Sequence, residues 1–440
     1  MDYHFGSRNA EVTFDSAYKD KFVKKLSFLL PPFDRFVAKV ELPEQEPVFP
    51  SRENEIRKIA DMIKGNRSMI IPVISEVGAG KTHFLWGIYN SFDVEAITTF
   101  LSFPRSKEKF LYYLYSNFIK QFGQNNLRDF SQNFGEKFGA AERLYGLFRT
   151  QNTERIVISA IDQLKDEYDP ECLEQCVNVT IQHLMDNDKS QIAERWLLGQ
   201  VMDVEDLFLI NATDDLSNEC MAKTMLKLII ENHNEEIVLL FDDLDKVAKE
   251  FDSSTVFNET GVDVNWAGDL EEVCEKNSPD SGEFALLEEL IALMKDINNL
   301  KIVVTLEQEE SGRFIEWLKD KQDKCSIYIA DPIQLGPISL KDAYHLYFSR
   351  LKNFCLKYNI NHPTADRFFK PEKDLEEYLD IYREDLYFPL NQEILEVIYG
   401  ITFGNPRQIL KNFKRIFDAI IFEEIRVEDI KTEYKRFLRK

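Results

Sequence analysis

The chain has 440 residues, of which 44% are hydrophobic and 30% charged, and its formal net charge is −23. This length allows two or three domains, and the composition is that of an ordinary folded protein. The sequence contains no run of 18 apolar residues and does not start with a basic region followed by an apolar block, so it predicts neither a membrane span nor a secretory signal. We therefore expect a cytoplasmic protein.

The negative charge is concentrated in one stretch. Residues 201–300 hold 25 Asp and Glu against six Lys and Arg, which is −19 of the net −23. Such a surface repels a phosphate backbone, so we expect DNA to be bound only weakly or through a partner. The stretch is either a solvated acidic face or a docking surface for a basic partner.

The first 48 residues predict an N-terminal arm, with an amphipathic stretch at residues 18–30 and then a proline-containing extended stretch. From residue 49, apolar runs of strand length alternate with helical patterns, which indicates an α/β fold with a parallel sheet. The expected strands are residues 68–74, 95–103, 236–242, 301–306 and 326–330. Pro72 lacks a backbone N–H, so we expect a local irregularity in the first strand.

More than 130 residues separate the second and third expected strands. A crossover between parallel strands needs only about a dozen. Apolar residues three and four apart predict helices in this stretch. We therefore expect an α/β core over residues 49–336 with a helical insertion at about 105–234, and a turn-rich loop at 246–282.

From residue 337 the pattern is entirely helical, which predicts a separate helical domain over residues 337–440. Ser339 with Asp342 predicts a capping box, and Asn391 predicts an N-cap. Asn405 followed by Pro406 predicts the start of a last long helix. The apolar stripe of that helix, expected in the core, is Ile409, Leu410, Phe413, Ile416, Phe417 and Ile420.

The six cysteines are scattered along the chain and do not form a disulfide framework. Cys172 and Cys176 are four residues apart, with His183 beyond them, but no second pair completes a tetrahedral zinc site. We expect buried thiols without a metal.

One segment matches the phosphate-loop pattern G-x-x-x-x-G-K-[ST] at every defined position except the first. It reads Ser75, Glu76, Val77, Gly78, Ala79, Gly80, Lys81 and Thr82. In such a loop, backbone N–H groups point at the phosphates and a helix begins directly behind them. The first position donates little, so we expect Ser75 to be tolerated there.

The other positions of this loop have distinct expected tasks. Gly78 and Gly80 let the backbone approach the phosphates, Lys81 offers its charge to the β and γ phosphates, and the hydroxyl of Thr82 ligates Mg²⁺. His83 is expected on the helix surface beside the nucleotide. The alternative is a chance Gly-Lys-Thr sequence in an ordinary loop.

Polar residues end two of the expected strands. Asp242 ends the strand at 236–242, at the edge of the sheet where ligands of parallel sheets bind. Asp242 would hold magnesium, and Asp243 would orient or deprotonate the attacking water. The alternative is an ordinary acidic turn. After the next strand, Thr305, or failing that Gln308, would sense the γ-phosphate.

Together these motifs resemble the AAA+ ATPases, in particular the origin-recognition initiator and STAND-like branch. The matching segments, in the order of that family, are FPSRENEI (49–56), SEVGAGKTHF (75–84), LLFDDLD (239–245), VVTLEQ (303–308) and GNPR (404–407). The resemblance covers about residues 45–440, and the helical insertion matches poorly. Within it, AERWLLGQ (193–200) is similar to ATPases of BREX-type phage-resistance systems and archaeal relatives.

The resemblance implies ATP and Mg²⁺ as cofactors, with Phe49 and Arg52 near the adenine. It implies that Thr305 is the polar sensor and that Arg407 is the arginine of a helical lid, touching the γ-phosphate. In the first turn of its helix, Arg407 also opposes the helix dipole, which favours a role in holding phosphate. Arg313 is the candidate for an arginine finger that reaches a neighbouring site.

One departure from the family concerns the water-activating position. Asp243 stands where the family has Glu, and the shorter side chain withdraws the carboxylate by about 1.5 Å. Since an error of about 1 Å in position can cost about 100-fold in rate, we expect slow hydrolysis with binding preserved.

The expected function is that of an ATP-binding and ATP-hydrolysing switch in a DNA-linked or anti-phage defence assembly. It would act through protein partners, in a homo- or hetero-oligomer, and without a membrane. Two alternatives stay open. One is a nucleotide-gated scaffold or STAND-like signalling protein with little turnover, which Asp243 favours. The other is a small-molecule kinase, which Arg407 and the late position of the lid disfavour.

Overall fold

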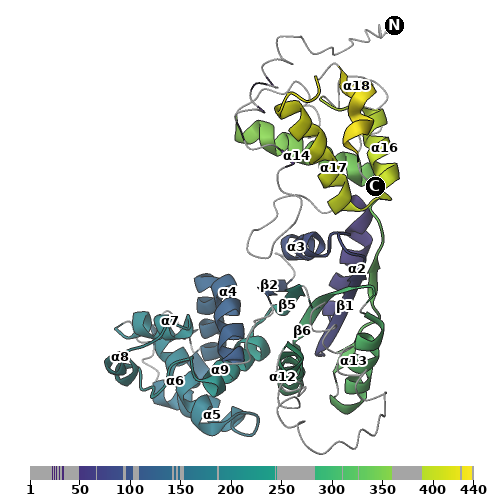
Figure 1. The fold of residues 1–440 in the computed structure, drawn as a ribbon. Coiled ribbons are helices and arrows are strands. Elements are labelled where there is room, and N and C mark those ends of the chain that lie inside the picture. Colours follow the sequence, from purple (N-terminus) through teal and green to yellow (C-terminus); the bar gives the residue numbers. More distant parts are fainter. Residues whose placement is uncertain are drawn as a thin grey trace, which may run out of the picture. The chain divides into compact units, whose positions relative to one another are not determined.

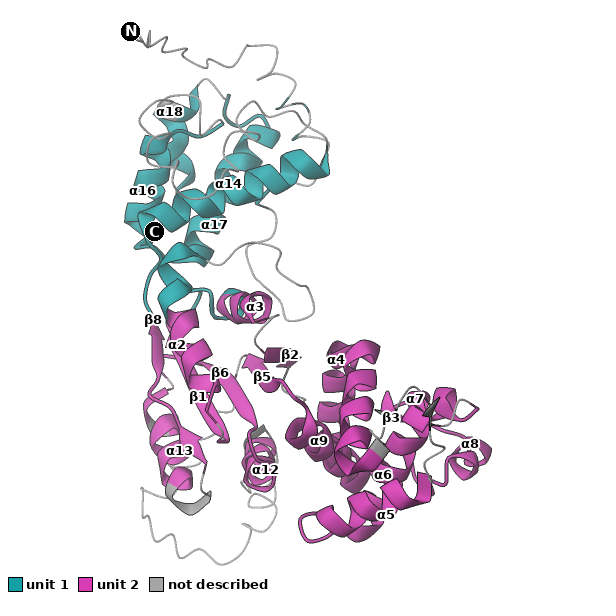
Figure 2. Cartoon of the chain, turned by 180° about the vertical axis from the view of Figure 1, so that it is seen from behind, with its two compact units in different colours: residues 1–54, 76–83, 335–440 teal, residues 55–75, 84–334 magenta. Residues whose placement is uncertain are grey.

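A computed structural model of the protein describes most of the chain. The described residues are 22, 24, 26, 29, 32, 33, 49–65, 67–92, 96–102, 109–140, 143–144, 147–148, 153–185, 188–242, 244, 283–309, 311–325, 327–358, 389–426 and 429–438. The chain divides into two compact units (Figure 2): unit 1 is Met1–Asn54, Glu76–His83 and Leu335–Lys440, and unit 2 is Glu55–Ser75 and Phe84–Gln334. Among the described helices, none combines the length and the apolarity that a bilayer crossing requires.

Unit 2 contains a parallel sheet (Figure 1). Its strands are β1 (Met69–Ser75), β2 (Ala96–Ser102), β5 (Glu236–Asp242), β6 (Lys301–Glu307) and β7 (Tyr328–Ile329), in the order β2-β5-β6-β1-β7, and β8 (Ile333–Leu335) pairs with β1. Every residue of β1 is buried, and β5 and β6 are buried except for one end residue each. Such continuous burial is typical of strands covered on both faces. The five expected strands and the α/β fold are confirmed.

The expected irregularity at Pro72 is wrong. β1 pairs with β6 without interruption from Met69 to Ser75, and Pro72 lies opposite Val304. The N–H of Met69 donates to the carbonyl of Leu300, the residue before β6. The carbonyl of Ile70 instead accepts from the N–H of Ala330, the residue after β7. Since bonding directions alternate along a strand, Pro72 faces the same side as Ile70, and its missing N–H removes no bond to β6.

Four further helices accompany these strands along the chain. They are α2 (Glu53–Ile63), α3 (Lys81–Ser91), α12 (Glu283–Asp296) and α13 (Ser311–Cys325). Leu290 of α12 and Phe314 of α13 belong to the same buried cluster as Ile302 of β6, so these helices share the core of the sheet.

Between β2 and β5 the chain is mostly helical, as expected. The elements are α4 (Phe110–Gly135), the π-helical turn η2 (Glu136–Ala140), α5 (Thr153–Leu164), α6 (Pro170–Met185), α7 (Ser190–Leu197), α8 (Val204–Leu209) and α9 (Glu219–Asn232). A two-residue hairpin of β3 (Arg143–Leu144) and β4 (Leu147–Phe148) was not predicted. Trp196 and Tyr115 are fully buried among these helices, and the hydroxyl of Tyr115 donates to the carbonyl of Leu197, 2.5 Å away.

Unit 1 is helical in its described part. After the 3-10 turn η1 (Pro50–Arg52) come α14 (Leu340–Lys357), α16 (Gln392–Thr402), α17 (Pro406–Ile421), α18 (Ile430–Glu433) and the 3-10 turn η4 (Tyr434–Phe437). The capping box of Ser339 and Asp342 and the N-caps Asn391 and Asn405 are confirmed. The expected stripe of α17 is buried throughout.

Part of the expected N-terminal arm belongs to the core of unit 1. Phe22, Leu26 and Phe33 are buried in one cluster with α14 and α17. The ring of Phe33 stacks on Tyr347, with ring centroids 5.5 Å apart, and lies 4.8 Å from Phe417. The expected extended stretch before residue 49 and the loop at 246–282 lie outside the described residues, and the expected domain boundaries stay predictions.

The cysteine expectation needs one correction. Cys172 and Cys220 form a disulfide, with Cα atoms 6.4 Å apart. Cys176 and Cys355 are buried free thiols, as expected. The packing of α6 against α9 brings the two bonded cysteines together. They are 48 residues apart in the chain, and no sequence pattern pointed to their pairing.

Candidate functional site

A tight loop of residues 76–80 joins β1 to α3. Gly78 and Gly80 have φ angles of +80° and +94°, and the N–H of Ala79 donates to the carbonyl of Glu76 at 3.2 Å. Glycine adopts positive φ without strain, so the two glycines of the pattern stand where the backbone needs them. Lys81 is the first residue of α3 and is only 8% exposed, and Thr82 follows it.

The start of α17 contacts this loop within unit 1. The N–H of Arg407 donates to the carbonyl of Gly78 at 3.2 Å, and Nδ2 of Asn405 donates to the carbonyl of Val77 at 2.9 Å. Oδ1 of Asn405 accepts from the N–H of Gln408 at 3.2 Å, so one side chain caps α17 and holds the loop. A Cβ atom on Gly78 would lie 2.9 Å from Cβ of Arg407, which leaves room for glycine alone.

A second glycine fixes the turn that leads into α17. Gly404 has a φ of +70°, and a Cβ atom there would lie 2.6 Å from the carbonyl oxygen of Ile338. The carbonyl of Gly404 accepts from the N–H of Ile338 at 3.0 Å, and the hydroxyl of Tyr399 donates to the carbonyl of Ile338 at 3.2 Å. These bonds set the direction in which the segment 404–407 meets the loop.

Unit 1 also contains an aromatic pair, Phe49 and His83. The rings of Phe49 and His83 are 4.6 Å apart at 31°. Burial lowers the pKa of His83 to about 4, helped by the positive charges of Arg350 and Arg52. The imidazole is therefore neutral at pH 7, and its buried Nε2 has no hydrogen-bond partner among the described residues.

The expectation that His83 lies on the helix surface is borne out only in part, because the residue is half-buried and its Nε2 is buried. Its ring packs against Phe49, which is 6% exposed. Arg52 is also buried, and its Nη2 donates to the carbonyl of Gly336. Phe49 and Arg52, the residues expected near the adenine, thus lie with His83 in unit 1.

In unit 2, two of the predicted residues meet at the ends of neighbouring strands. The hydroxyl of Thr305 donates to Oδ1 of Asp242 at 2.6 Å. Asp242 is 4% exposed and Thr305 is fully buried. Gln308, the other sensor candidate, donates its backbone N–H to the carbonyl of Ser75 at 3.0 Å. Thr305 is therefore the candidate that contacts the carboxylate.

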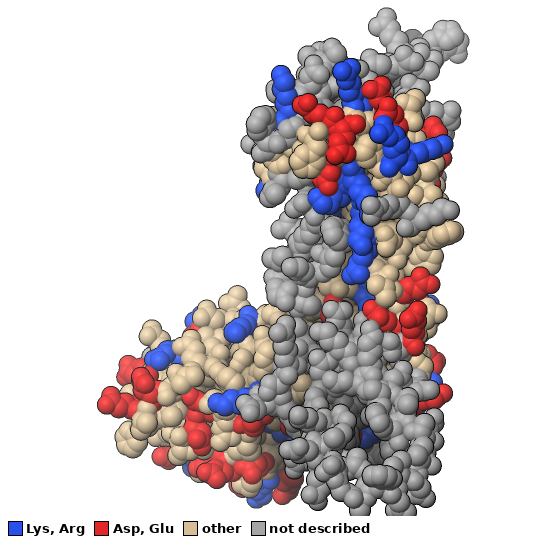
Figure 3. All heavy atoms as spheres, in the orientation of Figure 1, with Lys and Arg blue, Asp and Glu red and all other residues tan. Residues whose placement is uncertain are grey.

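Basic residues line one side of α17. Arg407, Lys411, Lys414 and Arg415 are partly exposed and follow helical spacing. Figure 3 shows Lys and Arg side chains in a run over the helices of unit 1. Lys414 pairs with Asp418 at 3.2 Å, so part of this charge is balanced within the helix.

The predicted site residues thus form two groups, one in each unit. Asp243 lies outside the described residues, and of Arg313 only its place in α13 is described, so their roles stay predictions. The sequence revealed the cap at Asn405 but not its bond to Val77, and no pattern pointed to the buried Nε2 of His83. Comparison with protein-family models, curated proteins and solved structures found no match.

Proposed function

We propose that the chain binds ATP with Mg²⁺ at residues 75–82 and hydrolyses it as an AAA+ ATPase. The observation that carries this proposal is the loop itself. It follows a buried parallel strand, places Gly78 and Gly80 at positive φ, and opens a helix with Lys81 and Thr82. A triphosphate fits such a loop because backbone N–H groups, a helix N-terminus and a lysine all favour negative charge.

Other residues take the remaining tasks. Thr82 would ligate magnesium, and the ion would supply charge neutralisation to the phosphates. The hydroxyl of Thr305 orients the carboxylate of Asp242, and Asp243 positions the attacking water. Because Asp243 has a shorter side chain than Glu, we propose slow turnover.

The aromatic pair supports a base-binding surface in unit 1. A neutral imidazole against a buried phenyl ring offers an apolar wall, and the unpartnered Nε2 of His83 offers one polar atom. Binding sites for small molecules combine apolar walls with a few polar atoms in this way. We place the adenine against Phe49 and His83, with Arg52 supporting them.

The bonds between the loop and α17 support a switch. Asn405 and Arg407 bind the carbonyls of Val77 and Gly78, so any change in the loop backbone on phosphate binding acts directly on the start of α17. A ligand shifts such an equilibrium by the difference between its affinities for the two states. We propose that ATP and ADP set different positions of this lid, with the side chain of Arg407 responding to the γ-phosphate.

The setting of this switch follows the resemblance: a DNA-linked or anti-phage defence assembly in the cytoplasm, reached through protein partners. The basic side of α17 supports weak contact with a phosphate backbone, whereas the acidic stretch opposes broad DNA binding. A second candidate is a nucleotide-gated scaffold or STAND-like protein with little turnover. The observation that favours it is Asp243 at the position of the usual Glu.

The test measures ATP-Mg²⁺ affinity by calorimetry for the wild type, Lys81→Ala and Lys165→Ala. Lys165 is an exposed lysine that pairs with Asp162 at 3.2 Å, and it serves as the matched control. We expect Lys81→Ala to abolish triphosphate binding and Lys165→Ala to leave it unchanged. Unchanged affinity in Lys81→Ala would remove the phosphate-loop assignment. Turnover of bound ATP in the wild type and in Asp243→Glu then separates the two candidates. Slow hydrolysis in the wild type that rises in Asp243→Glu supports the ATPase, whereas function without measurable hydrolysis supports the scaffold.

A further inference from the structure

Three potential metal ligands meet where two helices of unit 2 begin. One donor atom each from Asp169, Cys172 and Cys220 lies within 4.8 Å of the other two. Around a tetrahedral Zn²⁺ with bonds of about 2.3 Å, neighbouring donor atoms lie about 3.8 Å apart. Small side-chain rotations therefore suffice to place the two sulfurs and one carboxylate oxygen around a single ion.

Both cysteines occupy the first turn of a helix. Cys172 is the third residue of α6, and Cys220 is the second residue of α9. The positive end of a helix dipole stabilises a thiolate, which is the form of cysteine that binds a metal. Two helix N-termini thus favour the ligand form of both side chains once the disulfide is reduced.

Asp169, the third potential ligand, is held in place by hydrogen bonds at the start of α6. Its Oδ1 accepts from the N–H of Cys172 at 3.0 Å, and its backbone carbonyl accepts from the N–H of Leu173 at 2.8 Å. Oδ1 thus caps α6, and Oδ2 takes no part in that hydrogen bond. A disulfide needs no carboxylate beside it, whereas a cation held by two thiolates gains a third ligand from one.

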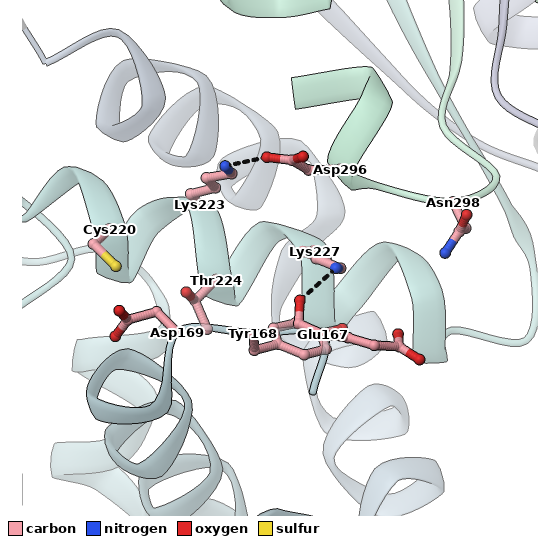
Figure 4. Close-up of a pocket in the computed structure, with 9 residues that line it drawn as sticks. All are labelled: Glu167, Tyr168, Asp169, Cys220, Lys223, Thr224, Lys227, Asp296 and Asn298. Carbon is pink, nitrogen blue, oxygen red and sulfur yellow. Dashed lines mark hydrogen bonds and ion pairs between the residues drawn. The ribbon is translucent and has the colours of Figure 1, made fainter. Parts of the chain in front are cut away.

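The site opens into a pocket of about 420 Å³. Figure 4 shows Asp169, Cys220 and Thr224 at one end of this pocket and Glu167, Lys227 and Asn298 toward the other. The two lysines are engaged elsewhere, because Lys223 pairs with Asp296 and Lys227 donates to the carbonyl of Glu167 at 2.9 Å. Cys220 lines the pocket, so solvent, ions and small thiols can reach the disulfide from its side.

We propose that Asp169, Cys172 and Cys220 form a redox-gated site for a thiophilic divalent cation, with Zn²⁺ as its metal. In the reduced chain the two thiols release their protons to solvent and bind the ion with the carboxylate, leaving a fourth position for water. A small-molecule disulfide closes the site: it takes two electrons from the thiolate pair and two protons from solvent and becomes two small thiols, while the protein disulfide forms and the ion leaves. The structure displays this closed, disulfide state.

Cys176 marks the limit of the site and provides its control. It lies one turn after Cys172 on α6, but its sulfur points to the carbonyl of Met221, 3.9 Å away. Burial raises the pKa of this thiol, so it stays protonated and is not a ligand. Cys176→Ala therefore removes a neighbouring cysteine without removing a ligand.

The experiment measures Zn²⁺ binding to the full chain by competition with a chromogenic chelator, after reduction and again after treatment with oxidised glutathione. We expect one Zn²⁺ per reduced chain, and none that competes with the chelator after oxidation. Cys220→Ala should weaken binding by about 100-fold or more, since even loss of an outer hydrogen-bond partner of a ligand costs about 10- to 100-fold. Asp169→Asn, which keeps the cap of α6 but not the charge, should weaken it by about 10-fold.

A second measurement separates ligand loss from misfolding. Co²⁺ in place of Zn²⁺ gives a thiolate-to-cobalt absorption whose intensity follows the number of bound sulfurs, and circular dichroism reports whether each variant is folded. We expect a folded Cys220→Ala with a weakened band and a folded Cys176→Ala with the band of the wild type. Absence of Zn²⁺ from the reduced wild type, equal binding in both redox states, or equal loss in Cys176→Ala would each overturn the proposal.

Discussion

The sheet edge of unit 2 and the loop contact of unit 1 hold their polar residues by different means. Asp242 and Thr305 are side chains at the ends of adjacent strands, brought together by strand pairing and buried among apolar neighbours. In unit 1, Gly78 and Gly404 are placed by backbone angles, and Asn405 bonds a residue 328 positions away. The sheet edge is therefore stabilised by burial, whereas the loop contact depends on a few backbone bonds that a ligand can alter.

The largest effect is expected where unit 1 depends on one backbone angle. Gly404→Ala places a Cβ atom 2.6 Å from the carbonyl oxygen of Ile338, at a φ of +70°. Strain of this kind together with the clash should destabilise unit 1 by about 3 kcal/mol. Hydrogen exchange of peptides from α16 and α17 measures the change.

The control is Gly400→Ala in the neighbouring helix. A Cβ atom at Gly400 meets nothing within 4 Å, and alanine favours a helix over glycine by about 1 kcal/mol. This variant should slow exchange slightly, whereas Gly404→Ala should speed it. Faster exchange by the same amount in both would show that the turn angle is unimportant.

The next largest effect is expected at the sheet edge of unit 2, when the bond between Thr305 and Asp242 is removed. Thr305→Val removes the hydroxyl that donates to Asp242 and leaves the shape of the side chain almost unchanged. Loss of a hydrogen bond to a buried charged group should destabilise unit 2 by about 2 kcal/mol. Urea unfolding measures the loss, and Thr305→Ser, which keeps the hydroxyl, should retain the bond to Asp242. A Val variant as stable as the wild type would contradict the assigned bond.

The third prediction concerns the pH dependence of stability that His83 contributes in unit 1. Its folded pKa of about 4 lies below the ordinary 6.5, so between these values the unfolded chain binds the proton and the folded chain does not. Stability should therefore be unaffected above about pH 6.5 and fall as the pH decreases, with a loss of about 1.5 kcal/mol at pH 5.5. Burial also lowers the pKa of His183 and of His233, which add to the acid sensitivity of unit 2.

The variant His83→Gln isolates this contribution. Urea unfolding at pH 7.5 and 5.5 should show a smaller pH dependence in the variant than in the wild type, by the amount given above. The contributions of His183 and His233 cancel because both chains keep them. An identical pH dependence in the two chains would mean that the imidazole of His83 is not withdrawn from solvent.

The sequence predicts features that depend on local residue patterns better than features that depend on tertiary packing. The strands, the caps and the stripe of α17 were predictable because apolar spacing and capping residues act locally. The phosphate-loop pattern also placed Gly78 and Gly80 correctly. Three features were not predictable, because each depends on tertiary packing: the bond from Asn405 to Val77, the contact of His83 with Phe49, and the disulfide of Cys172 with Cys220. The irregularity expected at Pro72 was wrong because the N–H that proline lacks would point away from β6, so the pairing of β1 with β6 loses no hydrogen bond.

The smallest effect concerns the bond that joins the loop to α17. Asn405→Asp keeps an oxygen to cap Gln408 but replaces the Nδ2 donor to Val77 with a second oxygen. Asp and Asn cap helices about equally, so the helix should persist while the loop contact loses about 1 kcal/mol. Hydrogen exchange at residues 76–80 should become faster, with α17 beyond its first turn unchanged. Under the proposed function, this bond connects the ATP-binding loop to the lid, so the difference between ATP and ADP in the exchange of α17 should also shrink. Asn391→Asp, which alters the cap of α16 alone, is the control, and an equal response in both variants would show that Asn405 acts only as a cap.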